Sequence, residues 1–311
     1  MNYRNIPKTD LNVSSLALGT WVFSGDSWGE AQEGQCVDAV SAALDQGLNF
    51  IDTAPIYGYG RAEEIVGKAI KGRRDQCVIA SKCGLIGRGK NITMNLTPES
   101  IFREIDETLK RLKIECVDLY QCHWPDPQTP IEKTMEAMCD LKRKGKIKYI
   151  GVSNFDIDLF KKAATITDVV TTQNQYSLVE RSIEKEILPF ANERGIGVMT
   201  YGSLGGGILS GKYRSQPQFA KADARTFFYR YYSGERFTRI NQLLADLDQF
   251  KKPLNQIAIN WIRQQPGITS VIVGCRNPQQ VKANVAALSW EFDPEQLREF
   301  DTILKERDFM A

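Results

Sequence analysis

The sequence is poor in the residues that build metal centres and disulfide frameworks. It has one histidine and seven cysteines in 311 residues, and no two cysteines form a Cys-x-x-Cys pair. Cysteines so sparse and irregular argue against a disulfide framework. A zinc site would need ligands scattered along the chain, because the usual ligand spacings are missing. We therefore expect no metal cofactor.

Long apolar runs and an excess of one charge are also missing. No stretch of eighteen apolar residues occurs, and residues 1–10 are too polar for a secretory signal, so we expect a cytoplasmic location. Forty basic side chains stand against 38 acidic ones, a net charge of +2. This balance disfavours nucleic acid and anionic membranes as partners. The composition, 42% hydrophobic and 25% charged, is typical of a globular chain that buries a core.

Short apolar runs alternate with amphipathic stretches from residue 16 onward, which predicts parallel strands joined by helices. The eight predicted strands are residues 16–18, 49–52, 77–82, 116–123, 147–153, 169–173, 197–200 and 270–273. Six of the seven intervals between strand starts fit one strand, one helix and two short loops, and the last interval carries an insertion.

Eight such units predict an α/β fold, a closed (β/α)8 TIM barrel that spans residues 1–311 as a single domain. An open doubly wound sheet is the main alternative, but its Gly-x-Gly-x-x-Gly motif is missing after the first strand, where the chain reads Leu18-Gly19-Thr20. We also predict an N-terminal β-hairpin with Asp10-Leu11-Asn12 at its turn. Extra helices in the C-terminal part are expected at residues 240–250 and 294–304.

Four chemically active side chains lie at or just after the ends of consecutive predicted strands. Asp52 ends the second strand, Tyr57 lies in the following loop, and Lys82 and His123 end the third and fourth strands. The carboxyl ends of barrel strands share one rim, which is where barrel enzymes hold their active sites. Each residue alone has an ordinary explanation as a helix cap, a solvated side chain or a buried, hydrogen-bonded histidine. Together they predict a proton-transfer site.

The expected chemistry follows from the charges of these side chains. A lysine ammonium close to Tyr57 would lower the pKa of the phenol from its usual value of ~10 toward the working range. Asp52 would keep Lys82 protonated and oriented, and His123 would hydrogen-bond a carbonyl oxygen. Because the set holds no nucleophile and no metal, it suits reduction of a carbonyl with a hydride from a cofactor.

Longer motifs carry a resemblance over nearly the whole chain. They are Gly19-Thr20-Trp21, Asp52-Thr53-Ala54-Pro55-Ile56-Tyr57-Gly58, Ser81-Lys82, His123-Trp124-Pro125-Asp126, Gly151-Val152-Ser153-Asn154-Phe155, Gln173-Asn174-Gln175-Tyr176-Ser177 and Gly211-Lys212-Tyr213. In order and spacing they resemble the aldo-keto reductases, in particular bacterial members related to the voltage-gated potassium-channel β-subunits. The resemblance implies NADPH-dependent reduction of aldehydes and ketones to alcohols. It makes Tyr57 the general acid, Asp52 and Lys82 the residues that tune it, and His123 the residue that orients the carbonyl.

The resemblance also implies a cofactor site across the top of the barrel. Ser153, Asn154 and Gln175 would bind the carboxamide of the nicotinamide, and Tyr201 would stack on its ring. The glycine-rich run from Gly202 suits a pyrophosphate, because backbone N–H groups can approach it closely. The implied cofactor set is Thr20, Trp21, Asp52, Ser153, Asn154, Gln175, Tyr201, Gly202, Ser203, Leu204, Gly205, Gly207, Lys212, Arg225, Gly274, Arg276, Gln280 and Asn284.

The choice between NADPH and NADH rests on one residue. The resemblance places Arg276 against the 2′-phosphate, with Gln280 and Asn284 near the adenine. An arginine fork suits a phosphate monoester, and a cation at a helix start is otherwise mildly unfavourable. We therefore predict a preference for NADPH.

Substrate selection is less constrained. Trp21, Trp28 and Trp124 fall in loops above the first and fourth strands, where with Tyr57 and His123 they would form an aromatic pocket for a small apolar or aromatic aldehyde. Packing at the barrel rim is the alternative for each tryptophan. The aromatic stretch at residues 227–232 either folds over the cofactor or substrate, forms a flexible lid, or makes an oligomer contact.

Two other functions stay open beside a reductase acting on a small carbonyl substrate. One is a regulatory or redox-sensing protein in the manner of the channel β-subunits, with slow turnover and the bound nucleotide as the signal. The complete catalytic set favours turnover but does not set its rate. The other is a lyase or isomerase without nicotinamide, against which the Arg276 segment and the glycine run argue. The sequence leaves homo-oligomer formation open.

Overall fold

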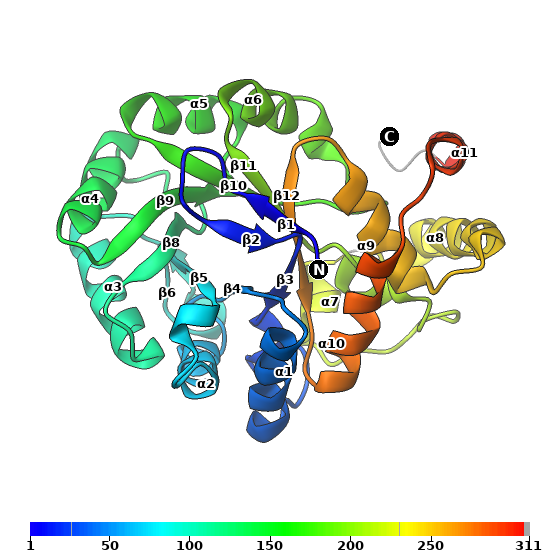
Figure 1. Ribbon diagram of the computed structural model, residues 1–311, viewed down its shortest axis with the longest axis horizontal. Helices are drawn as coiled ribbons and strands as arrows, with labels where there is room; N and C mark the ends of the chain where they lie inside the picture. The colour runs from blue at the N-terminus through cyan, green and yellow to red at the C-terminus, as the bar shows by residue number, and fades with distance from the viewer. Residues whose placement is uncertain (26, 230, 308–311) are drawn as a thin grey trace.

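Eight parallel strands form a closed barrel in the computed structural model, which describes residues 1–25, 27–229 and 231–307 (Figure 1). Each predicted strand corresponds to one of them, so the (β/α)8 prediction is confirmed and the open sheet is wrong. Pairing of β12 with β3 and of β9 with β10 completes the ring. The barrel strands are β3 (Leu16–Gly19), β4 (Phe50–Asp52), β5 (Val78–Cys83), β8 (Val117–Cys122), β9 (Ile147–Ser153), β10 (Val169–Gln175), β11 (Gly197–Tyr201) and β12 (Ile268–Gly274).

A layer of helices surrounds the barrel (Figure 1). Local signals fix where they begin: in α3, Thr97 accepts a hydrogen bond from the Ser100 backbone N–H and Pro98 occupies the first turn. The same helix buries Ile101 and Ile105 against the barrel. The surrounding helices are α1 (Glu33–Asp45), α2 (Arg61–Ala69), α3 (Pro98–Leu112), α4 (Ile131–Arg143), α5 (Ile157–Ile166), α6 (Ile187–Arg194), α9 (Leu254–Gln264) and α10 (Pro278–Val285).

An N-terminal hairpin of β1 (Tyr3–Asn5) and β2 (Asn12–Ser14) lies across one end of the barrel (Figure 1). Its apolar side chains, Ile6 among them, pack on barrel residues such as Phe50. The predicted turn is confirmed for Asp10 and Leu11 and wrong for Asn12, which already pairs with Asn5 in the ladder. The turn spans residues 6–11 instead, closed by the Ile6 N–H donating to the Leu11 carbonyl at 2.9 Å.

The C-terminal part contains the predicted extra helices. The helix expected at residues 240–250 begins earlier, as α8 (Gly234–Leu247) followed by the 3-10 turn η6 (Asp248–Phe250). The helix expected at 294–304 is α11 (Pro294–Arg307), which lies beside α8 (Figure 1). A short helix, α7 (Ala224–Phe227), precedes α8. None of the helices in the described ranges is long and apolar enough to cross a membrane.

A second hairpin, β6 (Leu85–Ile86) with β7 (Thr93–Met94), was missed by the sequence analysis. It stands between β5 and α3, at the end of the barrel where the strands finish. Strands of two residues carry no readable alternation, which is why the pattern did not predict them. The remaining 3-10 segments are η1 (Trp21–Phe23), η2 (Arg74–Gln76), η3 (Gly89–Asn91), η4 (Ser182–Glu184), η5 (Gly205–Ser210) and η7 (Ala286–Ser289).

Candidate active site

Asp52, Lys82 and Tyr57 meet inside the carboxyl end of the barrel. Asp52 ends β4 and Lys82 lies in β5, so neighbouring strands bring the Lys82 Nζ within 2.7 and 2.9 Å of the two Asp52 carboxylate oxygens. Both side chains are buried. Tyr57 follows β4 in the next loop, and its Oη lies 3.2 Å from the same Nζ. The structure thus brings these three predicted residues into direct contact.

The electrostatics of this cluster differ from expectation. Burial raises the pKa of Tyr57 well above its ordinary value, and the nearby negative charge of Asp52 raises it further. The predicted net lowering of this pKa is wrong, because burial of the phenol outweighs the stabilisation of its phenolate by the Lys82 ammonium. Burial lowers the pKa of Lys82, an effect that the charge of Asp52 opposes. Tyr57 is therefore a protonated phenol at neutral pH.

His123 stands beside this cluster, directly after β8. Its ring lies edge-on to the Tyr57 ring, with 5.7 Å between centroids. Burial lowers the pKa of His123 well below its ordinary value, and the positive charge of Lys82 lowers it further. The imidazole is therefore neutral near pH 7, with one nitrogen as a donor and the other as an acceptor.

A cavity of about 830 Å³ lies over the strand ends and takes in most of the predicted site. Four predicted residues do not line it: Thr20, Lys82 and Gly205 are buried, and Gln175 points elsewhere. The predicted residues that line the cavity are Trp21, Trp28, Asp52, Tyr57, His123, Trp124, Ser153, Asn154, Tyr201, Gly202, Ser203, Leu204, Gly207, Lys212, Arg225, Gly274, Arg276, Gln280 and Asn284.

Gln173 stands at the cavity where the sequence analysis put Gln175. The Gln175 amide donates to the Tyr231 hydroxyl at 3.0 Å, away from the cavity lining. The Gln173 amide lines the cavity and donates to Asp52 Oδ1 at 2.8 Å. The register between β10 and β9 identifies Gln173, because this residue pairs with Ser153, which also lines the cavity. One strand alone cannot reveal it, since residues two apart share a face.

A chain of hydrogen bonds links the histidine strand to Tyr201. The Asn154 amide nitrogen donates to the His123 carbonyl and to Ser153 Oγ, each at 3.0 Å, and its Oδ1 accepts from the Tyr201 hydroxyl at 2.8 Å. Asn154 adopts φ +60°, a left-handed conformation that is uncommon outside glycine. Backbone strain of this kind often marks functional positions.

The glycine-rich loop after β11 needs its glycines. Gly202, Gly205, Gly206 and Gly207 all have positive φ. A Cβ on Gly206 would lie only 2.9 Å from the ring of Tyr229. Gly202, Gly206 and Gly207 thus form a half-buried backbone wall at the cavity, in a conformation that residues with a side chain rarely adopt.

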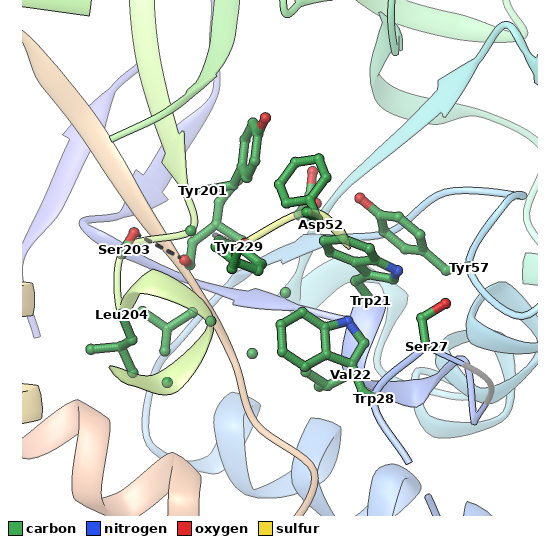
Figure 2. A pocket seen from close by; sticks show the side chains of 18 of the residues that line it. Trp21, Val22, Ser27, Trp28, Asp52, Tyr57, Tyr201, Ser203, Leu204 and Tyr229 are labelled. Atoms are coloured by element: carbon green, nitrogen blue, oxygen red, sulfur yellow. Dashed lines mark hydrogen bonds between the residues drawn. The ribbon is translucent and has the colours of Figure 1, made fainter. Parts of the chain in front are cut away.

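Aromatic side chains cover the cavity (Figure 2). The Trp21 ring is nearly parallel to the Tyr57 ring at 6.0 Å and edge-on to Trp28 at 5.2 Å. From the segment at residues 227–232, Phe228 lies against Trp21 at 5.4 Å and Tyr229 against Trp28 at 5.8 Å. Phe227, Phe228 and Tyr229 of this segment line the cavity, and Arg230 lies outside the described residues. A flexible lid and an oligomer contact stay alternatives.

Three cations, Lys212, Arg225 and Arg276, line the same cavity. Arg225 is paired with Asp223. The Arg276 Nη1 donates to the Trp28 carbonyl at 3.1 Å, and its backbone N–H donates to the Gln280 side chain at 2.8 Å. The bond to Trp28 joins the segment after β12 to the loop that carries Trp28, and the bond to Gln280 orders that segment itself.

Asn284 lies beyond Arg276, on α10. It accepts a hydrogen bond from Asn255 of α9 at 2.9 Å. Asn255 also lines the cavity, and sequence reasoning missed it because no motif marks the start of α9.

The comparisons with known proteins agree with this geometry. The model of the Aldo/keto reductase family matches residues 15–305. The chain belongs to the aldo/keto reductase family. Aldo-keto reductase YhdN of Bacillus subtilis (strain 168) is 39% identical over 98% of this chain and 94% of its own length. Among solved structures, the glycerol dehydrogenase AKR11B4 from Gluconobacter oxydans superposes with a TM-score of 0.90 at 33% identity, covering 99% of this chain and 97% of that one.

Two further relatives are informative about the cofactor and about the branch of the family. The NADH-specific methylglyoxal reductase of Escherichia coli (strain K12) is 34% identical over 90% of this aldo/keto reductase and 91% of its own length. A probable voltage-gated potassium channel subunit beta of Arabidopsis thaliana is 33% identical over 93% of this chain and 91% of its own length. The predicted relation to the channel β-subunit branch is confirmed, and the fold and family support an oxidoreductase that uses a nicotinamide cofactor.

Proposed function

We propose that this protein reduces aldehydes or ketones to alcohols with NADPH, and that Tyr57 donates the proton. The observation that carries the proposal is the Tyr57 phenol, kept protonated by burial and held 3.2 Å from the Lys82 ammonium at the wall of the cavity. A phenol in that position supplies a proton, and the ammonium stabilises the phenolate that remains.

The residues of the cavity fit a nicotinamide dinucleotide. Ser153, Asn154 and Gln173 offer hydroxyl and amide groups for the carboxamide, with Gln173 in place of Gln175. The backbone wall that begins at Gly202 suits a pyrophosphate, and Arg276 at the cavity suits a 2′-phosphate. When bound, the cofactor supplies the hydride that reaches the carbonyl carbon.

The chain's own residues perform the proton transfer and the orientation. His123, neutral at pH 7, donates a hydrogen bond to the carbonyl oxygen without adding a buried charge. Tyr57 then protonates the oxygen as negative charge develops on it. Asp52 holds Lys82 charged, and the Gln173 amide holds Asp52 in place. The aromatic cover limits the entry of water, which strengthens these interactions.

Arg276 sets the choice of nucleotide in this proposal. Arg276→Ala should weaken NADPH binding by about 10- to 100-fold, the loss of a charge-assisted contact, and leave NADH binding within about twofold. Fluorescence titration with each nucleotide measures both affinities. Because Arg276 also binds the Trp28 carbonyl, equal losses for both nucleotides would mean that it acts only by holding that loop. The NADH-specific relative makes this the sharpest test of the cofactor.

The function itself is tested by titrating the protein with NADPH and NADH, followed by a panel of small aldehydes in the same cuvette. We expect tight NADPH binding and aldehyde-dependent loss of the nicotinamide signal. Nucleotide binding with no turnover would favour a regulatory role, which the similarity to the channel β-subunit makes the second candidate. No binding of either nucleotide would contradict both.

A further inference from the structure

Exposed apolar side chains gather at the cavity from two distant parts of the chain. In the described part of the chain, six large apolar side chains are exposed, and three of them line the cavity: Ile92, Met94 and Phe227, with exposed fractions of 40, 49 and 55%. Ile92 and Met94 belong to the β6–β7 hairpin, and Phe227 belongs to α7. Exposed apolar residues that line a cavity usually mark a binding surface.

Apolar lining continues toward the reaction centre. Leu85 of the hairpin, Tyr59 of the Tyr57 loop and the aromatic residues Trp21 and Trp124 line the same cavity. We call this set, together with Ile92, Met94 and Phe227, the outer apolar wall. The wall therefore begins beside the residues that would contact the carbonyl, since Trp21 lies 6.0 Å from the Tyr57 ring and Trp124 follows His123, and it extends to exposed positions.

Among the described residues that line the cavity, none from the β6–β7 hairpin or from the loop that carries Tyr57 is charged. The cations that line the cavity are Lys212 of the glycine-rich loop, Arg276 after β12, and Arg225, which lies on α7 with Phe227 but is already paired with Asp223. Arg88 of the hairpin loop stacks on the Tyr59 ring, with 5.0 Å between guanidinium carbon and ring centroid, and does not line the cavity. A carboxylate on the substrate would lose its water without gaining an ion-pair partner at the wall.

Hydrogen bonds hold the β6–β7 hairpin in place at the cavity. The Gly89 N–H donates to the Tyr59 hydroxyl at 2.9 Å, which ties the hairpin loop to the loop that carries Tyr57. At its base, the Gly84 N–H donates to the buried Glu104 carboxylate at 3.1 Å, and the Asn95 N–H donates to the Gly84 carbonyl at 3.0 Å. A surface anchored at both ends binds an apolar group at lower entropic cost.

We propose that the site selects carbonyl compounds that carry an extended, uncharged apolar substituent, and that this substituent packs on the outer apolar wall. The inference rests on the proposed reductase function and names its substrate class. It extends the predicted small aromatic pocket outward, from the three tryptophans to Ile92, Met94 and Phe227.

The first experiment compares substrates with the same reacting group. For straight-chain aldehydes from propanal to octanal, kcat/KM should rise by about two- to fourfold per methylene, as expected for burial of apolar surface. For a matched aromatic pair, 4-methylbenzaldehyde should be reduced at least about tenfold more efficiently than 4-carboxybenzaldehyde, because of the desolvated carboxylate. Equal values for the pair, or a flat series, would overturn the inference.

The second experiment places a charge on the wall and a matched charge elsewhere. Ile92 and Ile166 are both isoleucines with nearly equal exposed fractions, 40 and 39%, but Ile166 lies at the end of α5 and does not line the cavity. Ile92→Lys should lower the octanal-to-propanal ratio of kcat/KM several-fold and raise the ratio of 4-carboxybenzaldehyde to 4-methylbenzaldehyde. Ile166→Lys should change neither ratio.

The outcomes separate the two proposals. Turnover of propanal with unchanged ratios in Ile92→Lys would overturn the outer apolar wall and leave the reductase function standing. No turnover of any aldehyde with either nucleotide would overturn the reductase function, and this inference with it. A reactivity that falls as the chain lengthens would point to small polar carbonyl compounds instead.

Discussion

The inner end of the cavity and its outer cover are held together in different ways. At the inner end, Asp52, Lys82 and Gln173 sit on barrel strands, are buried, and are joined by hydrogen bonds between charged and polar atoms. In the cover, rings such as Trp28 and Tyr229 come from loops and meet mainly through ring contacts. The positions of the inner groups thus follow from the sheet, whereas those of the outer rings follow from how loops pack.

This difference predicts where substitutions matter most. A buried ion pair is costly to break, because the partner that remains is an uncompensated charge. Contacts between rings can be repacked at smaller cost. Variants of the inner end should therefore change chemistry and stability strongly, and variants of the cover should change specificity and affinity by smaller factors.

The largest effect is expected from removal of the proton donor. Tyr57→Phe should lower the rate of carbonyl reduction by about 10²- to 10⁴-fold and keep nucleotide affinity within about twofold, since only one hydroxyl is lost. Tyr59→Phe, in the same loop, is the matched control, and its rate should stay within about tenfold of wild type. Single-turnover kinetics with prebound nucleotide measures the step. Fast reduction by Tyr57→Phe would remove Tyr57 from the mechanism.

The next effect is on stability. Lys82→Met leaves the Asp52 carboxylate buried without its cation and should cost about 3–5 kcal/mol of unfolding free energy. Adding Asp52→Asn to that variant should recover a large part of the loss, because no buried charge then remains. Urea unfolding of the wild type, the single variant and the double variant measures both steps. A double variant less stable than Lys82→Met would show that the pair is not coupled in this way.

The contrast between barrel and cover also explains what the sequence could predict. The four predicted catalytic positions follow from local patterns, because a polar residue at the end of an apolar run, or in the loop just after it, reaches the same rim of a closed barrel. The direction in which folding shifts the pKa of Tyr57 does not follow from the sequence. It depends on burial of the phenol and on the position of the Asp52 charge.

Contacts that depend on strand register or on tertiary packing could not be predicted from the sequence either. Gln173 and Gln175 share a face of one strand, and only the pairing with β9 distinguishes them. The two-residue strands at Leu85 and Thr93, and the side on which Tyr229 packs, depend on partners distant in the sequence.

A buried carboxyl group at the base of the β6–β7 hairpin extends the comparison. Glu104 receives hydrogen bonds from the Gly84 N–H and the Ser100 hydroxyl, which are neutral donors, and burial raises its pKa to about 7. Since this is above the unfolded value, the folded state holds the proton more tightly. The resulting stabilisation is complete below about pH 4.5 and is lost as the pH rises through about 7.

Glu104→Gln should therefore remove about 2 kcal/mol of the pH dependence of unfolding between about pH 5 and pH 7.5. The exposed Glu136 on α4 provides the control, and Glu136→Gln should leave the dependence unchanged. Urea unfolding at the two pH values gives the difference directly. Equal dependence in wild type and Glu104→Gln would mean that Glu104 is charged in the folded protein throughout this range.

The smallest effect is expected where the sequence and the structure disagree. Gln175→Leu removes only the hydrogen bond to the Tyr231 hydroxyl, so nucleotide affinity should stay within about twofold and stability should fall by about 1 kcal/mol. Gln173→Leu, two residues earlier on the same strand, takes a donor from buried Asp52 and a group from the cavity lining. It should weaken nucleotide binding and slow reduction together. If fluorescence titration instead finds the larger loss of affinity in Gln175→Leu, then Gln175, which the sequence motif indicated, binds the nucleotide and Gln173 does not.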